Sequence, residues 1–324
     1  MGKETKGMAS AAADLRSLGP NSNLDVFDAD YLQTDESYRA SCNAVIDRLV
    51  KFLQNNVPIS VKEVVKGGSL AKGTALKGKS DIDLVLFLSK YHDVESVVRD
   101  MNELLRTLEQ YLGKYGECKI TGKTRFSVQV NVACHAHHEH AVDLLPACDV
   151  LGDLKPAKVY DQMNVSEDRQ YFSASLVKLQ LAFVRELPAK VKSLIRIVKH
   201  WRKSVLPYDS RRWPTSYILE LITIKKWKDA GSPDQFPLKR GFHSVLRALG
   251  NYSKLKVIWC DNYGPRYEKH TPPYVVDPAN PFNNVMDRCD VWEDVATIAR
   301  KTLGWKIFFG IRKLENWKNR NIWN

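Results

Sequence analysis

Two aspartates stand directly before an apolar run of residues. Asp81 and Asp83 are one residue apart, and the sequence LVLFL at residues 84–88 has the length and apolar content of a buried strand. Side chains at positions i and i+2 of a strand point to the same face of the sheet. Two carboxylates on one face repel each other, so this pair predicts a site that binds cations.

A third carboxylate is expected beside them. Residues 126–132 alternate in period two, and a polar hairpin then returns into AVDLLPA, which places Asp143 on an adjacent antiparallel strand. Carboxylate oxygens suit hard cations, and three carboxylates can hold two Mg²⁺ ions roughly 3.5 to 4 Å apart, with Mn²⁺ as an alternative. In such a site one ion orients a triphosphate and the other activates an attacking hydroxyl. We therefore predict Asp81, Asp83 and Asp143 as metal ligands and catalytic residues.

A glycine-serine turn precedes these acids in the chain. Gly68 and Ser69 supply backbone amides and a hydroxyl where glycine allows phosphate oxygens to approach closely, and Lys72 adds a positive charge. An Asp-x-Asp pair alone is common at a strand edge, where it is simply solvated. The turn, the pair and the third acid together favour a nucleotide site.

The elements that must position these residues divide the chain into two lobes. Helices are predicted at 35–54 and about 94–112, and strands at 61–66, 84–88 and 126–132. Beyond residue 156 the pattern is helical, at 172–185, 188–203, 216–230, 242–252 and 291–303. We predict an α/β (α+β) protein with a flexible lead-in at 1–22, a mixed-sheet catalytic lobe at 23–155 and a helical lobe at 156–324.

Composition and charge restrict the class of partner. The chain has 324 residues and a formal net charge of +12, which favours a polyanionic partner such as nucleic acid or a nucleotide. No apolar run is long enough to span a membrane, and the N-terminus lacks the apolar core of a signal peptide. The six cysteines form no CxxC pair, as is typical of reduced thiols in a cytoplasmic protein.

A basic stripe follows the predicted helix at 188–203. At about 100° per residue, Lys192, Arg196, Lys199 and Lys203 share one face, while Lys190 lies on the opposite flank. Such a stripe is as often a solvated helix face as a binding surface. The carboxylate cluster favours the second interpretation.

The segment CHAHHEH at 134–140 contains residue types that bind zinc. Its spacings match none of the usual paired patterns, and adjacent side chains on an extended segment point apart. We predict an exposed, titrating loop and expect no zinc.

Three segments carry a family resemblance: GGSLAKGTALKGKSDIDLVLFL, VDLLPACDVLG and KSLIRIVKHWRK. They resemble the 2′-5′-oligoadenylate synthetases, in the nucleotidyltransferase superfamily that includes DNA polymerase beta, and the similarity runs from about residue 25 to 300. The chain looks like a divergent, non-vertebrate-type member. The resemblance implies the two-lobed nucleotidyltransferase fold, with Asp81, Asp83 and Asp143 as its metal-binding acids.

The resemblance also implies contacts with the nucleotide. Ser69 and Lys72 match the phosphate-contacting loop beside Gly68, Arg196 and Lys199 match donor-triphosphate contacts, and Tyr217 matches a base-stacking tyrosine. Ser216 replaces a glutamine that is usual in vertebrate members. Because a serine hydroxyl offers fewer hydrogen bonds to a base than an amide, discrimination between adenine and guanine is expected to be looser.

An activating double-stranded RNA is implied on another surface. The resemblance assigns Lys66 and Lys190 to this RNA, and Lys62 and Arg185 are further candidate contacts. Duplex RNA is recognised through phosphates and 2′-hydroxyls, so its sequence matters little. Gln54 and Leu181 stand where cationic contacts are usual, which predicts a shifted or weaker RNA surface.

The function implied is RNA-activated, template-independent synthesis of 2′-5′-linked oligoadenylates from ATP, an innate-immune second messenger of antiviral defence, by a monomer that binds no membrane. Two alternatives stay open. The first is a cyclic GMP-AMP synthase-like receptor that makes a cyclic dinucleotide, although the zinc-binding insert of that enzyme is missing. The second is a catalytically silent RNA-binding sensor, which would have no chemical need for three clustered acids.

Overall fold

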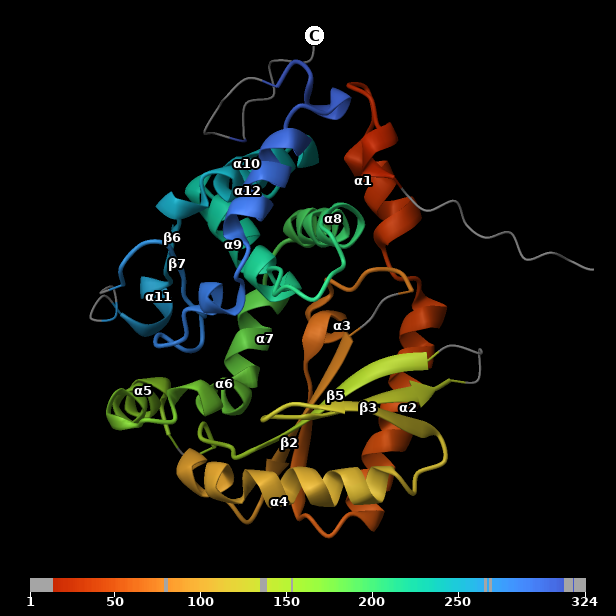
Figure 1. The fold of residues 1–324 in the computed structure, drawn as a ribbon, viewed down its shortest axis with the longest axis vertical. Helices are drawn as coiled ribbons and strands as arrows, with labels where there is room; N and C mark the ends of the chain where they lie inside the picture. The colour runs from red at the N-terminus through yellow and green to blue at the C-terminus, as the bar shows by residue number, and fades with distance from the viewer. Residues whose placement is uncertain are drawn as a thin grey trace, which may run out of the picture.

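The computed structural model describes residues 14–78, 81–134, 139–152, 154–264, 267, 270–311 and 317, and it describes the backbone but not the side chain of Asp81. A five-stranded sheet forms one lobe, and a group of helices lies above it in the view of Figure 1. The predicted two-lobed α/β architecture is therefore confirmed.

The sheet is mixed, with the strand order β1-β2-β5-β4-β3. Its strands are β1 (Val61–Lys66), β2 (Asp81–Leu88), β3 (Cys118–Lys123), β4 (Val128–Ala133) and β5 (Glu139–Ala147). The central pair β2 and β5 is parallel, and the other neighbours are antiparallel. The predicted hairpin between β4 and β5 is confirmed, and it brings β5 beside β2.

Successive side chains of β2 point to opposite faces of the sheet. Leu84 and Leu86 pack into a core with α2 (Glu36–Asn56) and α4 (Val94–Leu112), which lies below the sheet in Figure 1. Val85 and Phe87 face the other way, toward a smaller cluster with α7 (Val177–Arg185). Asp83 shares the phase of Val85, so its side chain is on the face toward the helical lobe.

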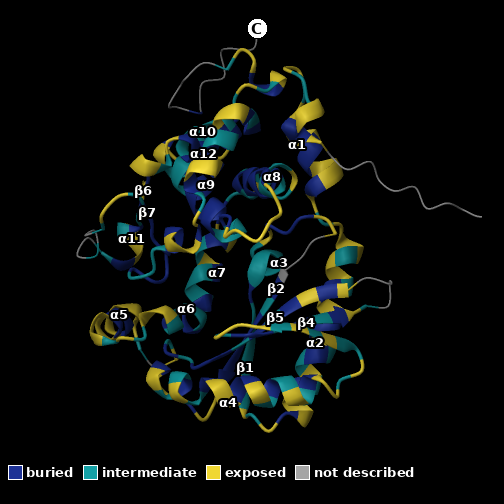
Figure 2. Ribbon diagram, in the orientation of Figure 1, coloured by how far each residue is buried: buried dark blue, intermediate teal, exposed yellow. Residues whose placement is uncertain are grey.

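The helical lobe contains two helices with long buried stretches, α8 (Ala189–Val205) and α9 (Ser216–Asp229), which pack on each other. Its helices are α5 (Pro156–Val165), α6 (Phe172–Ser175), α7, α8, α9, α10 (Leu238–Gly250), α11 (Cys260–Tyr263) and α12 (Trp292–Thr302). Figure 2 shows α8 as predominantly buried, with α5 exposed at the periphery. The helix predicted at 172–185 is interrupted at Leu176, whose backbone leaves the helical conformation. A two-stranded parallel ladder pairs β6 (Lys256–Val257) with β7 (Tyr274–Val275).

The N-terminal part of the described chain packs on the helical lobe. It comprises a 3₁₀ turn, η1 (Leu15–Ser17), then α1 (Leu24–Phe27) and one π-helical turn, η2 (Asp28–Leu32). Leu15, Leu24 and Phe27 are buried, and η2 contacts α8. The Leu32 carbonyl accepts from the Lys77 N–H of the sheet lobe at 2.9 Å, so residues 24–32 contact both lobes. The domain boundaries stay a prediction.

The six cysteines all lie within the described residues, and no two of them are joined by a disulfide bond. Burial raises the pKa of Cys148 and of Cys289 to about 11, so both thiols are protonated at neutral pH. Within the described ranges, no helix combines the length and apolar character needed to cross a membrane.

Candidate active site

Asp83 and Asp143 lie opposite each other on the two central strands. They are direct partners in the parallel register of β2 and β5, so their side chains leave the same face of the sheet. Asp81 pairs through its backbone with Ala141, two positions earlier, and its side chain is outside the described part of the structure. The structure therefore brings two of the three predicted acids together and leaves the third as a prediction.

Gln129 holds the Asp143 carboxylate. It faces Asp143 across β4 and β5, and its Nε2 donates to Oδ1 at 3.2 Å and to Oδ2 at 3.3 Å. Gln129 was not predicted as a site residue from the sequence. Its polar position in the alternating segment VQVNVA is the signal that could have found it, because it has the phase of the strand face that carries Asp143.

The glycine-serine turn is fastened to β2. The Gly67 N–H donates to the Asp83 carbonyl at 2.6 Å, and a Cβ at Gly67 would lie 3.2 Å from the Asp83 Cβ. Gly68 has φ +71°, a left-handed conformation that favours glycine. These two glycines place Ser69, in the short helix α3 (Gly68–Lys72), at the same cleft as Asp83.

A cleft of about 640 Å³ opens in front of these residues. Gly68, Ser69, Lys72 and Asp83 line it from the sheet lobe, and Lys199, Ser216 and Tyr217 line it from the helical lobe. Four aromatic side chains also face it: Phe126, Tyr171, Tyr217 and Phe282. The cleft thus combines carboxylates, cations and flat apolar surfaces, which suits a ligand with a base and several phosphates.

Glu220 fixes the position of Lys72. The Lys72 Nζ lies 2.8 Å from Glu220 Oε1, and the Thr74 hydroxyl donates to Oε2 at 3.1 Å. Glu220 is 3% exposed, and Lys72 also lies 4.3 Å from the centroid of the Tyr217 ring. Burial, together with the charges of Asp277 and Glu220, raises the pKa of Tyr217 well above its ordinary value, so its hydroxyl stays protonated.

A second buried carboxylate, Asp277, also lines the cleft. Its Oδ2 accepts from Gln180 Nε2 at 2.9 Å, and its Oδ1 accepts from the Ala279 N–H at 2.8 Å. Burial raises its pKa, against the opposing effects of the Ala279 N–H and the charge of Lys72. Sequence reasoning missed Glu220 and Asp277. Glu220 carries a weak signal, as the lone acid in the apolar segment YILELITI.

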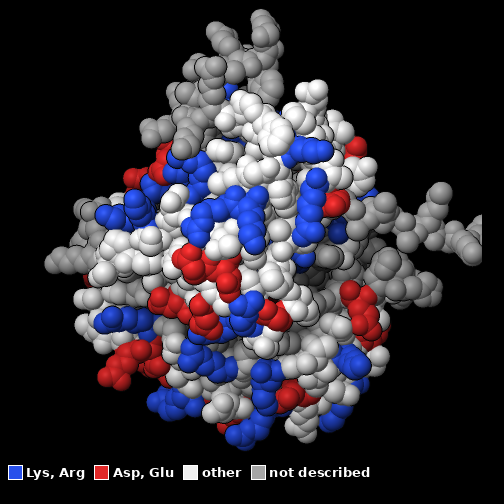
Figure 3. Space-filling model, turned by 45° about the horizontal axis from the view of Figure 1, so that its top comes forward, with Lys and Arg blue, Asp and Glu red and all other residues white. Residues whose placement is uncertain are grey.

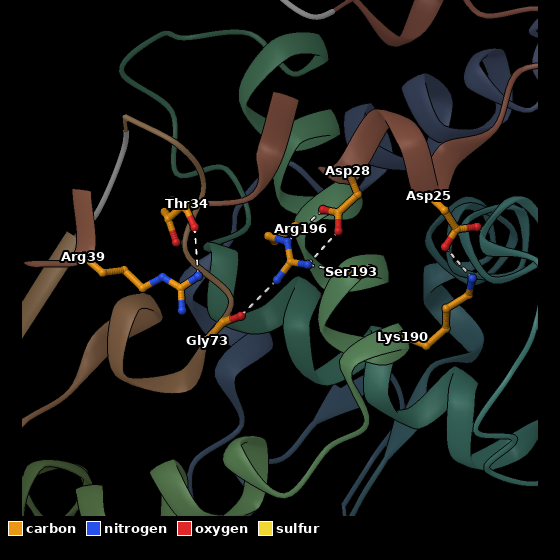
Figure 4. A network of polar contacts seen from close by, with 8 residues as sticks. All are labelled: Asp25, Asp28, Thr34, Arg39, Gly73, Lys190, Ser193 and Arg196. Carbon is orange, nitrogen blue, oxygen red and sulfur yellow. Dashed lines mark hydrogen bonds and ion pairs between the residues drawn. The ribbon is translucent and has the colours of Figure 1, made fainter. Parts of the chain in front are cut away.

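Lys199 and Arg196, predicted together, have different surroundings. Lys199 lines the cleft and donates to the Thr74 carbonyl at 2.9 Å. Arg196 is not among the residues that line it. Figure 4 shows its guanidinium directed at Asp28 and at the carbonyl of Gly73. In this conformation Arg196 is a buried link between segments, and its predicted contact with the triphosphate would require the pair with Asp28 to open.

The four predicted RNA contacts are engaged with neighbours in the protein. Lys66 lies 2.8 Å from Asp47 on α2, and Lys62 lies 3.9 Å from Asp149. Lys190 pairs with Asp25, and Arg185 donates to the Ala71 carbonyl at 3.0 Å. Lys62 and Lys66 both belong to β1 but form ion pairs with different parts of the protein. The assignment of these residues to RNA stays a prediction.

The donor set at β2 and β5 fits a hard cation, because it consists of carboxylate oxygens. Among the described side chains, no three His, Cys, Asp or Glu residues come close enough to hold a metal ion, and the Asp81 side chain is not among those described. Residues 135–138 of the histidine-rich segment also lie outside the described residues, so the expected absence of zinc is untested. The neighbouring His140 is buried, with Nδ1 3.5 Å from the Cys42 Sγ.

Comparisons with solved structures show the fold. The chain superimposes on the Bradyrhizobium diazoefficiens CD-NTase CdnG in complex with GTP with a TM-score of 0.58, at 15% identity over 89% of this chain and 92% of that one. It superimposes on E. coli MS115-1 CdnC with ATP with a TM-score of 0.54, at 20% identity over 86% and 88%. Both likenesses place the chain within one nucleotidyltransferase architecture.

Comparisons of sequence show the family. A model described as "2'-5'-oligoadenylate synthetase 1, domain 2, C-terminus" matches residues 154–321, and one described as "Nucleotidyltransferase domain" matches residues 46–127. The chain is 31% identical to 2'-5'-oligoadenylate synthase 1A of Mus musculus over 84% of this chain and 83% of the relative. It is 32% identical to the "Inactive 2'-5'-oligoadenylate synthase 1B" of Rattus norvegicus over 84% and 81%. The chain belongs to the 2′-5′-oligoadenylate synthetase family.

Proposed function

We propose that this protein is a double-stranded-RNA-activated nucleotidyltransferase that joins ATP units through 2′-5′ linkages, acting as a cytoplasmic monomer in antiviral defence. The observation that carries the proposal is the register of Asp83 with Asp143, together with the cleft that Asp83 lines with Ser69, Lys72, Lys199 and Tyr217. Carboxylates next to phosphate-binding cations are the arrangement that nucleotidyl transfer requires.

The residues divide the chemistry between them. The acceptor 2′-oxygen forms a bond to the α-phosphorus of the donor ATP, the bond to the β-phosphate oxygen breaks, and pyrophosphate leaves. Asp143 accepts the hydroxyl proton, and Lys72 and Lys199 neutralise the phosphates. Tyr217 stacks on a base. Mg²⁺ bound by Asp81, Asp83 and Asp143 would supply further charge neutralisation and acidify the attacking hydroxyl.

Family membership alone does not establish turnover, because a rat relative of similar identity is named inactive. The acids of this chain support activity, since a silent binding protein gains nothing from two adjacent carboxylates on one sheet face. A cyclic dinucleotide is the second candidate product, favoured only by the shared architecture of the CD-NTases.

One incubation separates these functions. The full chain is mixed with all four NTPs, Mg²⁺ and duplex RNA, and then with ATP as the single nucleotide, and the products are identified by mass spectrometry. We expect ATP alone to give linear oligomers that keep a 5′-triphosphate and resist a nuclease specific for 3′-5′ linkages. The reaction without RNA should be much slower. A product that needs GTP, or that lacks a terminal phosphate, would assign the protein to cyclic dinucleotide synthesis.

A further inference from the structure

A second cavity lies on the helical lobe, away from the active-site cleft. It has a volume of about 520 Å³, and no residue lines both cavities. Its walls come from the C-terminal half of α9, from α10 and from the segment that enters β6. Trp317, whose ring packs 4.8 Å from that of Phe236, also lines it. Cavities of this size hold small molecules rather than a nucleic-acid duplex.

The lining of this cavity is strongly basic. Its cations are Lys225, Lys226, Arg240, Arg247, Lys254 and Lys256, with His243 among them. Asp229 is the one carboxylate among the described lining residues, and it is already shared by Lys225 and Lys226. Among the described lining residues, six cations are therefore accompanied by one carboxylate. Figure 3 shows basic side chains over the helical lobe, in the upper half of the view, with fewer acidic ones between them.

Several of these cations have no compensating charge among the described residues. Arg247, Lys254 and Lys256 form no ion pair with any carboxylate in the ranges that the structure describes. Like charges that converge around one cavity raise the free energy of the protein alone, and an anion between them removes that cost.

The helix dipole does not explain the cluster. Cations are favourable in the last turn of a helix, which suits Lys226 on α9 and Arg247 on α10. Arg240, however, is in the first turn of α10, where the dipole disfavours a cation, and it is only 9% exposed. Lys254 and Lys256 lie beyond the end of α10. The shared feature of the group is the cavity.

We propose that this cavity binds a compact small molecule with clustered phosphate groups, of the class of inositol polyphosphates or inorganic polyphosphate. Guanidinium and ammonium groups from three segments can each donate to a different phosphate oxygen. α9 contributes Ser216 and Glu220 to the active-site cleft and Lys225 to this cavity, so a bound anion would also stabilise the helix that carries the nucleotide contacts.

Isothermal titration calorimetry on the full chain tests the proposal. The probes are inositol hexakisphosphate, tripolyphosphate and ATP, each measured first without and then with a saturating non-hydrolysable ATP analogue in the active-site cleft. The double variant Arg247→Gln/Lys254→Gln should lower affinity for the best probe by about tenfold or more, the change expected from losing charge-assisted contacts. The matched control Lys158→Gln/Lys301→Gln removes two exposed charges of the same lobe and should leave the affinity unchanged.

Thermal unfolding provides the second measurement. Inositol hexakisphosphate should raise the midpoint for wild type and control but not for the double variant. If the first variant does not fold, Lys254→Gln/Lys256→Gln replaces it, since both side chains are exposed. Equal affinities of variant and wild type would overturn the proposal, as would binding that the ATP analogue abolishes. A third outcome is that the variant loses duplex RNA binding while wild type binds no polyphosphate. The cavity would then be part of an RNA-binding surface, and the proposal of a small-molecule site would be refuted.

Discussion

Asp28 and Arg196 form a buried, bidentate ion pair that joins the N-terminal segment to α8. The Arg196 Nε donates to Oδ1 at 2.8 Å and Nη2 donates to Oδ2 at 2.6 Å, and the two side chains are 6% and 3% exposed for Arg196 and Asp28 respectively. The same guanidinium donates to the Gly73 carbonyl at 3.0 Å. The Arg196 side chain therefore links η2, α8 and Gly73, the residue that follows α3 (Figure 4).

We expect Asp28→Asn to lower the free energy of unfolding by about 3 to 5 kcal/mol, because it leaves the Arg196 charge buried without its partner. Chemical denaturation measures this. Asp25→Asn is the matched control: its pair with Lys190 is more exposed on the Asp25 side, and its loss should cost about 0 to 1 kcal/mol. Equal stabilities of the two variants would contradict a structural role for the Asp28 pair.

Much of the fold is predictable from the sequence, because strong periodicity reports burial directly. The helices at 94–112 and 188–203 and the strand at 61–66 were predicted nearly to the residue. β3 was missed because it is an edge strand whose residues alternate between exposed and half-buried, with a glycine near its end. Such a strand carries little apolar signal and depends on pairing with β4.

The candidate site was predictable only where its residues are close in the chain. Gly68, Ser69 and Asp83 lie within one short segment whose residue types are informative together. Glu220 reaches Lys72 from 148 positions away, and Gln180 reaches Asp277 from 97. Contacts at such separations depend on how segments far apart in the chain pack together, and no local pattern records that. For the same reason, the sequence did not reveal that Arg196 pairs with Asp28, which is 168 positions away.

Removal of one acid should abolish catalysis while the fold survives. We expect Asp83→Asn or Asp143→Asn to reduce oligoadenylate synthesis by about a thousandfold or more, equivalent to about 4 kcal/mol of transition-state stabilisation. Stability should change little, because neutralising one of two adjacent carboxylates relieves repulsion. Rates are measured by pyrophosphate release, with Asp100→Asn on α4 as the control. An Asp83→Asn enzyme with near-normal rate would refute the assignment, and Asp81→Ala is expected to behave like Asp83→Asn.

Binding of duplex RNA should depend on Lys66 and Lys190. The double variant Lys66→Glu/Lys190→Glu is expected to bind duplex RNA more weakly and with a shallower salt dependence, because fewer phosphates are neutralised. Binding of the ATP analogue should stay nearly unchanged, since neither residue lines the cleft. Fluorescence anisotropy at several salt concentrations measures both effects, with Lys158→Glu/Lys301→Glu as the matched control. The same affinity and the same salt slope in variant and wild type would exclude this surface.

Base discrimination should respond to Ser216. This residue begins α9, lines the cleft next to Tyr217 and is half-buried, so its side chain is placed to meet a base that stacks on the tyrosine ring. A hydroxyl donates and accepts through a single atom, whereas a glutamine amide presents N–H donors and a carbonyl acceptor side by side and reaches further. We expect Ser216→Gln to raise the ratio of kcat/KM for ATP over GTP by about tenfold, the value of one hydrogen bond that the wrong base cannot complete. Ser216→Ala removes the hydroxyl without adding an amide and should not raise the ratio. The ratio is measured with both nucleotides in competition. If Ser216→Gln and wild type discriminate equally, this position does not read the base.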